Sequence, residues 1–229
     1  MIPIRDHNPT AGPIYVVWAL VLTSVAAFFL PWFAGGDGAL LAAAYRLGLV
    51  PAALWAQPAG RWPTLITYAF LHGGLLHLVG NLVFLWVFGD NVEDRLGHGR
   101  FLVFYLLGAA VAAAAHALVT ADPSLPLIGA SGAVSAVLGA YLRYYPHKAV
   151  QAVVLPLIVP WLALRVLFRV RPFFLWTLPA WVYLAYWALV QLWEGIAGYG
   201  VMGGGVAWWA HVGGFAFGLL LAPAFARRD

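Results

Sequence analysis

Six long apolar stretches follow one another along this chain, and each is about as long as a lipid bilayer is thick. An α-helix needs about 20 apolar residues to cross roughly 30 Å of hydrocarbon. Charged residues form only 9% of the sequence, against roughly 25% in soluble domains, too few to cover a surface in water. We therefore predict an all-α, polytopic membrane protein, a six-transmembrane-helix bundle that forms a single domain over residues 1–229. The predicted spans are about 14–33, 66–89, 101–120, 128–145, 174–194 and 206–226.

The composition also excludes several kinds of site. The sequence contains no cysteine, so disulfides, thiolate metal sites and a cysteine nucleophile are excluded. The net charge of +4 comes from basic residues that are scattered rather than clustered, which argues against nucleic acid as a partner. We expect no metal and no cofactor, and the lipid bilayer as the surrounding solvent.

The positions of the basic residues predict how the chain is oriented. With six spans and a cytoplasmic N-terminus, ten basic residues lie inside and only Arg46 and Arg61 lie outside, in agreement with the positive-inside rule. Residues 149–171 are apolar enough for a seventh span but contain three arginines and two prolines. A seventh span would reverse the last helices, so we interpret 149–171 as an inside, interfacial or re-entrant segment. Both termini are then cytoplasmic, in a plasma (inner) membrane.

Ser131 lies in Gly129-Ala130-Ser131-Gly132, at the outer end of the fourth predicted span. Small neighbours let another backbone approach the hydroxyl group. The N-terminus of a helix favours a developing negative charge through its dipole and its free N–H groups. These are the properties of a serine nucleophile. Taken alone, the motif also fits helix packing, because small residues let membrane helices approach closely.

His211 lies about five residues into the sixth predicted span and shares a helix face with Gly214 and Gly218, at i, i+3 and i+7. An ionisable side chain within a span indicates a functional site, because isolated polar groups are costly in lipid. A histidine that only bonds a neighbouring helix is the alternative. A serine hydroxyl is a weak nucleophile until an adjacent base takes its proton, and His211 is the candidate base.

The predicted topology brings Ser131 and His211 to a similar depth in the membrane. The fourth and sixth spans both run from outside to inside. Ser131 begins the fourth span, and His211 lies ~8 Å down the sixth at 1.5 Å per residue. We therefore predict a two-residue dyad, since the interiors of the predicted spans contain no carboxylate that could complete a triad.

His77 and Asn81 lie at i and i+4 in the outer half of the second predicted span and therefore point the same way. Hydrogen-bond donors beside a nucleophile stabilise a tetrahedral oxyanion by roughly 3–4 kcal/mol each. We predict that His77, Asn81 and the backbone N–H of Ser131 form an oxyanion hole. A purely structural role, tying helices together, is the alternative for both side chains.

These residues occur in an order typical of a known family. From roughly Thr64 to Phe225, the chain resembles the rhomboid intramembrane serine proteases. The loop Glu93-Asp94-Arg95 also resembles the family's Glu-x-Arg loop. The matching motifs are His77-x-x-x-Asn81, Gly129-x-Ser131-Gly132 and Ala210-His211-x-x-Gly214-x-x-x-Gly218.

The resemblance implies a rhomboid bundle and serine endopeptidase activity. It implies that Ser131 is the nucleophile and His211 the general base, with His77, Asn81 and the Ser131 N–H as the oxyanion hole. Substrates would be single-spanning membrane proteins, cleaved near the outer membrane face. The glycines of the motifs, which would support the site, are Gly129, Gly132, Gly214 and Gly218.

Two positions depart from the family pattern. Many rhomboid proteases carry a Trp-Arg pair in the first outer loop, where this sequence has Arg61-Trp62. Some carry a tyrosine, four residues after the nucleophile, that stacks on the catalytic histidine; the corresponding residue here is Ser135. Either another residue orients His211, for example the aromatic Trp208 or Trp209, or nothing does.

Other functions compete with the protease. A non-catalytic rhomboid-like protein that binds client helices would usually lack the serine or the histidine. A small transporter also fits polar residues and glycine-broken helices, but the two halves show no repeat and the spans no carboxylate that could couple ions. Zinc and aspartyl intramembrane proteases are disfavoured, because the sequence lacks a His-Glu-x-x-His motif and a pair of aspartates within the spans.

Overall fold

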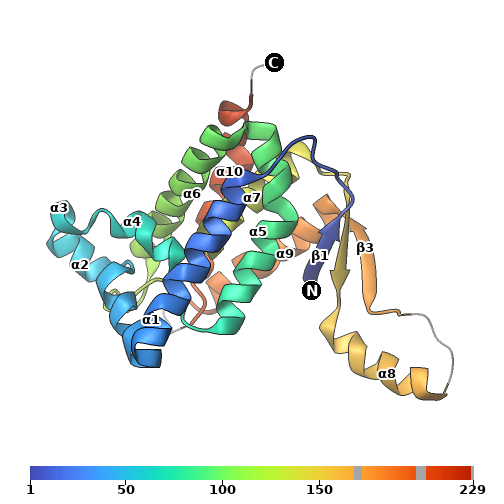
Figure 1. The fold of residues 1–229 in the computed structure, drawn as a ribbon, viewed down its shortest axis with the longest axis horizontal. Coiled ribbons are helices and arrows are strands. Elements are labelled where there is room, and N and C mark those ends of the chain that lie inside the picture. The colour runs from blue at the N-terminus through green and yellow to red at the C-terminus, as the bar shows by residue number, and fades with distance from the viewer. Residues whose placement is uncertain (168–171, 200–204, 228–229) are drawn as a thin grey trace.

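A computed structural model describes residues 1–167, 172–199 and 205–227. Helices form the body of the molecule, and a small antiparallel sheet with one further helix extends from its side (Figure 1). In chain order the elements are β1 (Ile2–Asp6), α1 (Tyr15–Leu47), α2 (Pro51–Ala56), α3 (Pro58–Arg61), α4 (Thr64–Thr67), η1 (Tyr68–Phe70), α5 (Leu75–Leu96), α6 (His98–Val119), α7 (Ser131–Tyr144), β2 (Ala149–Val153), η2 (Leu155–Leu157), α8 (Ile158–Leu167), β3 (Leu175–Pro179), α9 (Ala180–Ala197) and α10 (Trp208–Phe225).

A helix lies at each of the six positions predicted from the apolar stretches. In the described part of the chain, four of them, α1, α5, α6 and α10, are long and apolar enough to cross a membrane. The helix α7 has 14 residues, about 21 Å at 1.5 Å per residue, and α9 has 18. The prediction of a mainly helical membrane protein is confirmed, whereas length and hydropathy support four of the six predicted spans.

Several predicted boundaries were wrong. The first helix continues past residue 33 to Leu47, with its helical backbone interrupted at Gly35 and Gly36. The second span was predicted from residue 66, but α5 begins only at Leu75, after a non-helical loop. The fifth was predicted from residue 174, where β3 precedes α9. Hydropathy alone does not separate a short apolar strand from an apolar helix, which explains the last error.

The described part of the segment 149–171, residues 149–167, forms a strand and two short helices rather than a span. Its strand, β2, pairs antiparallel with both β1 and β3, and Asp6 at the end of β1 accepts a hydrogen bond from Tyr141 of α7. The helix α8 has 10 residues, too few to cross a bilayer. It lies beyond the sheet, away from the bundle (Figure 1). Residues 168–171 are outside the described ranges.

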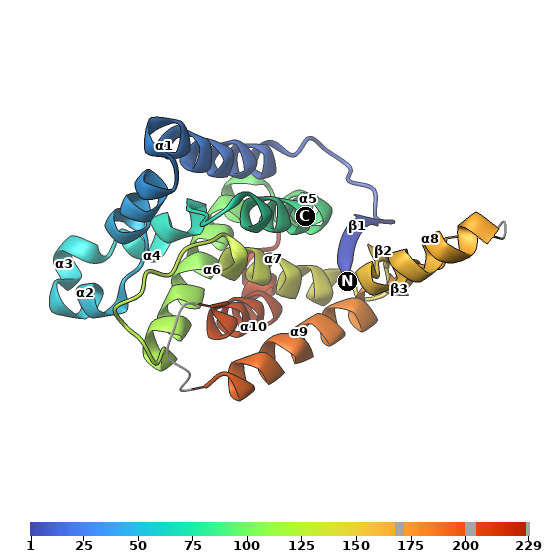
Figure 2. The same cartoon turned by 90° about the horizontal axis from the view of Figure 1, so that it is seen from below.

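Helix α7 lies at the centre of the bundle, between α5 and α10 (Figure 2). Each residue from Gly132 to Tyr141 is buried. A Cβ atom on Gly214 would overlap the carbonyl oxygen of Gly132, and one on Gly218 would overlap that of Ala136. The contacting residue numbers rise together along both helices, so α7 and α10 run parallel. This confirms the predicted relative direction of the helices that carry Ser131 and His211.

Glu93 joins the end of α5 to the beginning of α1. Its fully buried carboxylate accepts hydrogen bonds from the backbone N–H groups of Val16 and Val17, at 2.8 and 2.7 Å. His98 Nδ1 lies 2.6 Å from the same carboxylate. The first N–H groups of a helix have no acceptor within the helix, so Glu93 supplies acceptors that α1 lacks.

We expect Glu93→Ala to lower the free energy of unfolding by about 3 kcal/mol, because the buried N–H group of Val17 and the partly buried one of Val16 lose their acceptor. Thermal unfolding in detergent micelles, followed by circular dichroism, measures the loss. Asp94→Ala is the matched control. Its carboxylate accepts a hydrogen bond from Ala11 N in an exposed position, so we expect a loss below about 1 kcal/mol. Equal losses in the two variants would contradict the role given to Glu93.

Candidate active site

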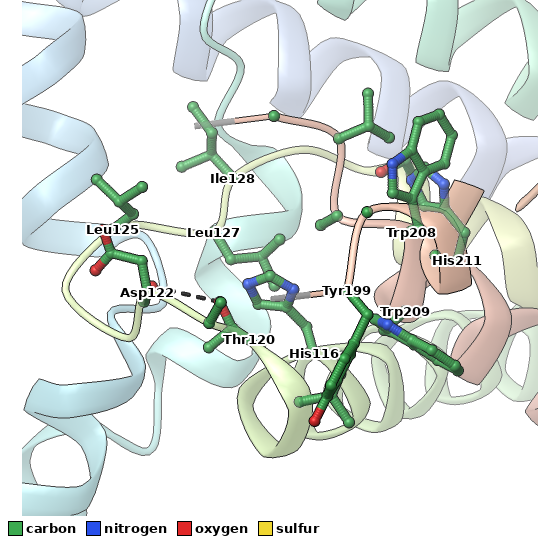
Figure 3. Close-up of a pocket in the computed structure, with 18 of the residues that line it drawn as sticks. His116, Thr120, Asp122, Leu125, Leu127, Ile128, Tyr199, Trp208, Trp209 and His211 are labelled. Atoms are coloured by element: carbon green, nitrogen blue, oxygen red, sulfur yellow. Dashed lines mark hydrogen bonds between the residues drawn. The ribbon is translucent and has the colours of Figure 1, made fainter. Parts of the chain in front are cut away.

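A cavity of about 790 Å³ lies between the N-terminal ends of α7 and α10 and the C-terminal ends of α6 and α9. Ser131, His211 and His77 all line it, although they come from three different helices. In Figure 3, His211 and Trp208 lie at one end of the cavity, and the loop with Asp122 lies at the other. The structure therefore brings the predicted serine and histidines to one cavity.

Ser131 is the first residue of α7, and the preceding segment determines where that helix starts. Leu127 and Leu49 exchange a pair of backbone hydrogen bonds, and Gly129 N donates to Tyr68 O at 3.0 Å. Gly129 then turns the chain with a φ of +119°, a conformation that favours glycine. The hydroxyl of Ser131 is thus carried on a helix N-terminus whose first N–H groups have no acceptor within the helix.

His77 and Asn81 approach this turn from α5. A Cβ atom on Gly129 would lie 2.6 Å from His77 Nε2 and 3.8 Å from Asn81 Nδ2, so both side chains face Gly129. Asn81 is buried and donates to the carbonyl oxygen of His77 at 3.0 Å. His72, in the loop before α5, places Nε2 3.5 Å from the backbone nitrogen of Ala130. Polar side chains from α5 and its preceding loop therefore surround the turn that leads into Ser131.

His211 is held by side chains from its own helix and from α9. Its Nδ1 lies 2.6 Å from Oε1 of Gln191 on α9. The ring of Trp187, also on α9, lies 6.1 Å from the imidazole at an interplanar angle of 35°. Trp208 contacts the imidazole edge-on, at 6.0 Å and 89°. One of the two aromatic candidates, Trp208, is thus a neighbour of His211, and it acts together with two residues of α9.

Gln191 was not among the site residues predicted from the sequence, although a signal was present. Gln191, like His211, is a polar side chain within an apolar stretch. Such a side chain indicates a site, because polar groups within a span need a partner. The contact itself joins residues on different helices. Only the packing of α9 on α10 brings the two side chains together.

The positions that depart from the family pattern have other contacts here. Ser135 is fully buried, and its Oγ donates to the carbonyl oxygen of Ser131 at 2.6 Å. A Cβ atom on Gly214 would lie 3.3 Å from Ser135 Cβ, so a small residue suits the close approach of α10. In the outer loop, Arg61 donates to the carbonyl oxygen of Arg46 at 3.3 Å, while Trp62 is exposed.

Gly132 adds a third close approach beside Ser131. A Cβ atom there would lie 2.6 Å from Ala112 Cβ on α6 and 2.8 Å from the hydroxyl of Tyr68. Tyr68 in turn donates to the carbonyl oxygen of Ala109 at 2.8 Å. The glycines of the motifs thus let α6, α7 and α10 approach closely around one cavity. Across the described ranges, no cluster of three or more histidine or acidic residues is arranged to hold a metal ion.

Comparisons with known proteins identify relatives over this same part of the chain. A family model described as the rhomboid domain matches residues 59–228. The rhomboid protease GluP of Bacillus subtilis is 41% identical over 83 residues, 36% of this chain and 16% of the relative. The rhomboid protease GlpG of Pectobacterium atrosepticum is 29% identical over 136 residues, 59% of this chain and 45% of the relative.

The chain is also similar to a eukaryotic protein. The mitochondrial presenilin-associated rhomboid-like protein A of Danio rerio is 32% identical over 96 residues, 41% of this chain and 25% of the relative. The chain therefore spans less than half the length of these curated relatives. The domain match covers most of the chain and includes Ser131, His77 and His211. This multi-pass integral membrane protein belongs to the rhomboid family.

Proposed function

We propose that this protein is an intramembrane serine endopeptidase that cleaves single-spanning membrane proteins near the outer face of the bilayer. The observation that carries the proposal is the cavity shared by Ser131, His211 and His77, which come from three helices. The relatives named as rhomboid proteases support the reaction class.

The proposed reaction is acyl transfer through Ser131. Its Oγ attacks the scissile carbonyl carbon while the hydroxyl proton passes to Nε2 of His211. The carbonyl oxygen becomes an oxyanion, stabilised by donors from His77, Asn81 and the Ser131 N–H. His211 returns the proton to the leaving amine as the C–N bond breaks, which leaves an ester on Ser131. Water, deprotonated by His211, then hydrolyses the ester and frees the serine.

The proposed topology has six spans, with both termini in the cytoplasm and the protein in the plasma (inner) membrane. The distribution of ten basic residues inside and two outside supports it. The N-terminal end of α7 then faces outwards, which puts the proposed nucleophile on the side where water enters. In this topology α7, with its 14 residues, is a short central span enclosed by longer helices.

A fluorophosphonate probe tests the nucleophile directly. We expect it to modify Ser131 of the folded protein and to leave Ser24, Ser124 and Ser135 unmodified, because only an activated serine reacts rapidly. Mass spectrometry of the labelled protein identifies the modified residue. Ser135→Ala is the control, since that hydroxyl is buried within α7. Absence of labelling at Ser131 would favour the non-catalytic, client-binding alternative.

A further inference from the structure

Gln191 and His211 form a buried polar pair between α9 and α10. Gln191 Oε1 lies 2.6 Å from Nδ1 of His211. The two residues are 7% and 8% exposed, so water does not readily replace either partner. An amide oxygen only accepts hydrogen bonds, so the proton of this bond belongs to the imidazole. The contact therefore requires hydrogen on Nδ1 of His211.

This requirement determines the other ring nitrogen as well. A neutral imidazole carries one N–H group, and its second nitrogen is an acceptor. With hydrogen on Nδ1, Nε2 is unprotonated and available to accept a proton from elsewhere. His211 lines the cavity that also contains Ser131. The pair with Gln191 thus selects the tautomer that a general base for a serine hydroxyl needs.

The neighbouring rings restrict the imidazole further. Trp187 and Gln191 are at i and i+4 on α9 and so share one face. Trp187 lies beside His211 at an angle of 35°, and Trp208 meets it edge-on at 89°. These contacts limit tilting of the ring, whereas they do not distinguish its two nitrogens. Among the contacts of the described residues, the hydrogen bond to Gln191 makes that distinction.

We propose that Gln191 is a positioning residue, which holds His211 in its Nδ1–H tautomer with Nε2 free to take the Ser131 proton. The contribution of Gln191 to catalysis rests on the proposed protease function. A carboxylate would orient the ring in the same way, but a buried charge in a span is costly in lipid. A neutral amide gives orientation without that charge. It also accepts from Nδ1–H when His211 becomes doubly protonated during the reaction.

Gln191→Met tests the acceptor, because methionine is similar in size and unbranched but cannot accept strongly. We expect kcat to fall about 10-fold with KM nearly unchanged, since Gln191 touches the base rather than the substrate. Leu192→Ala is the control on the same helix, because Leu192 is 39% exposed. Its kcat should stay close to wild type. An unchanged kcat in Gln191→Met would overturn the proposal.

Gln191→Glu separates positioning from packing. It keeps an acceptor on Nδ1, so most of the activity remains, but its charge favours the protonated imidazole. The acidic limb of the pH–rate profile should therefore move to higher pH. The other titratable groups that line the cavity, and so contribute to the same profile, are His77, His116, Asp122 and Tyr199. A profile that coincides with that of the wild type would contradict a bond between residue 191 and the base.

Heteronuclear NMR of the histidine ring nitrogens gives a readout independent of turnover. The His211 signals are assigned by their loss in His211→Gln. We expect the Nδ1–H tautomer in the wild type and a mixture of tautomers in Gln191→Met. An Nε2–H tautomer in the wild type would overturn the inference. Turnover no greater than that of Ser131→Ala, with the expected spectra, would instead refute the protease proposal and leave the tautomer assignment supported.

Discussion

Ser131→Ala should lower turnover of a fluorogenic transmembrane substrate by a factor on the order of 10⁴ or more, down to background. The substitution removes the only atom proposed to bond to the substrate carbonyl carbon. It leaves α7 otherwise intact, because alanine is tolerated at the first position of a helix. Purified protein in detergent or liposomes, with cleavage followed by fluorescence, provides the measurement.

Two further variants make this result specific. Ser135→Ala removes a hydroxyl that bonds within α7, so its turnover should remain within a few-fold of wild type. His211→Gln should lose activity to a similar extent as Ser131→Ala, and the double variant should be no worse than either, because groups that act as a unit are not additive. Equal turnover by the wild type and Ser131→Ala would end the protease proposal.

Gly218→Ala is expected to destabilise the bundle by at least about 3 kcal/mol. A Cβ atom there would overlap the carbonyl oxygen of Ala136, an atom of the α7 backbone. Neither helix can relieve this overlap by rotating a side chain, so α7 and α10 must separate. Thermal unfolding in micelles, together with the yield of folded protein, measures the loss.

Gly80→Ala is the matched control. Gly80 lies within α5, and a Cβ atom there would have no neighbour within 4 Å. Alanine should stabilise that helix slightly, by up to about 1 kcal/mol, because it has the higher helix propensity. If Gly218→Ala unfolded at the same temperature as the wild type, that result would contradict the close contact between α7 and α10. The depth match between Ser131 and His211 would then lose its structural basis.

Local sequence patterns predicted much of the fold and of the candidate site. Apolar stretches of bilayer length placed the main helices, because hydropathy and length are local properties of the chain. The i, i+3 and i+7 spacing of His211, Gly214 and Gly218 predicted one shared face, and the structure packs Gly214 and Gly218 against α7. Charge counting also predicted that these two helices run the same way, and their parallel contacts confirm that relative direction.

Other features depend on contacts between distant segments, and only the tertiary structure decided them. The strand β1 pairs with β2, roughly 150 residues later, so no local pattern marks it as a strand. Likewise, α5 begins only at Leu75, and the loop before it places Nε2 of His72 3.5 Å from the backbone nitrogen of Ala130. The partner of His211 is the clearest case. The sequence by itself determined that an intramembrane histidine needs a polar neighbour, whereas only the packing of α9 on α10 decided that Gln191 is that neighbour.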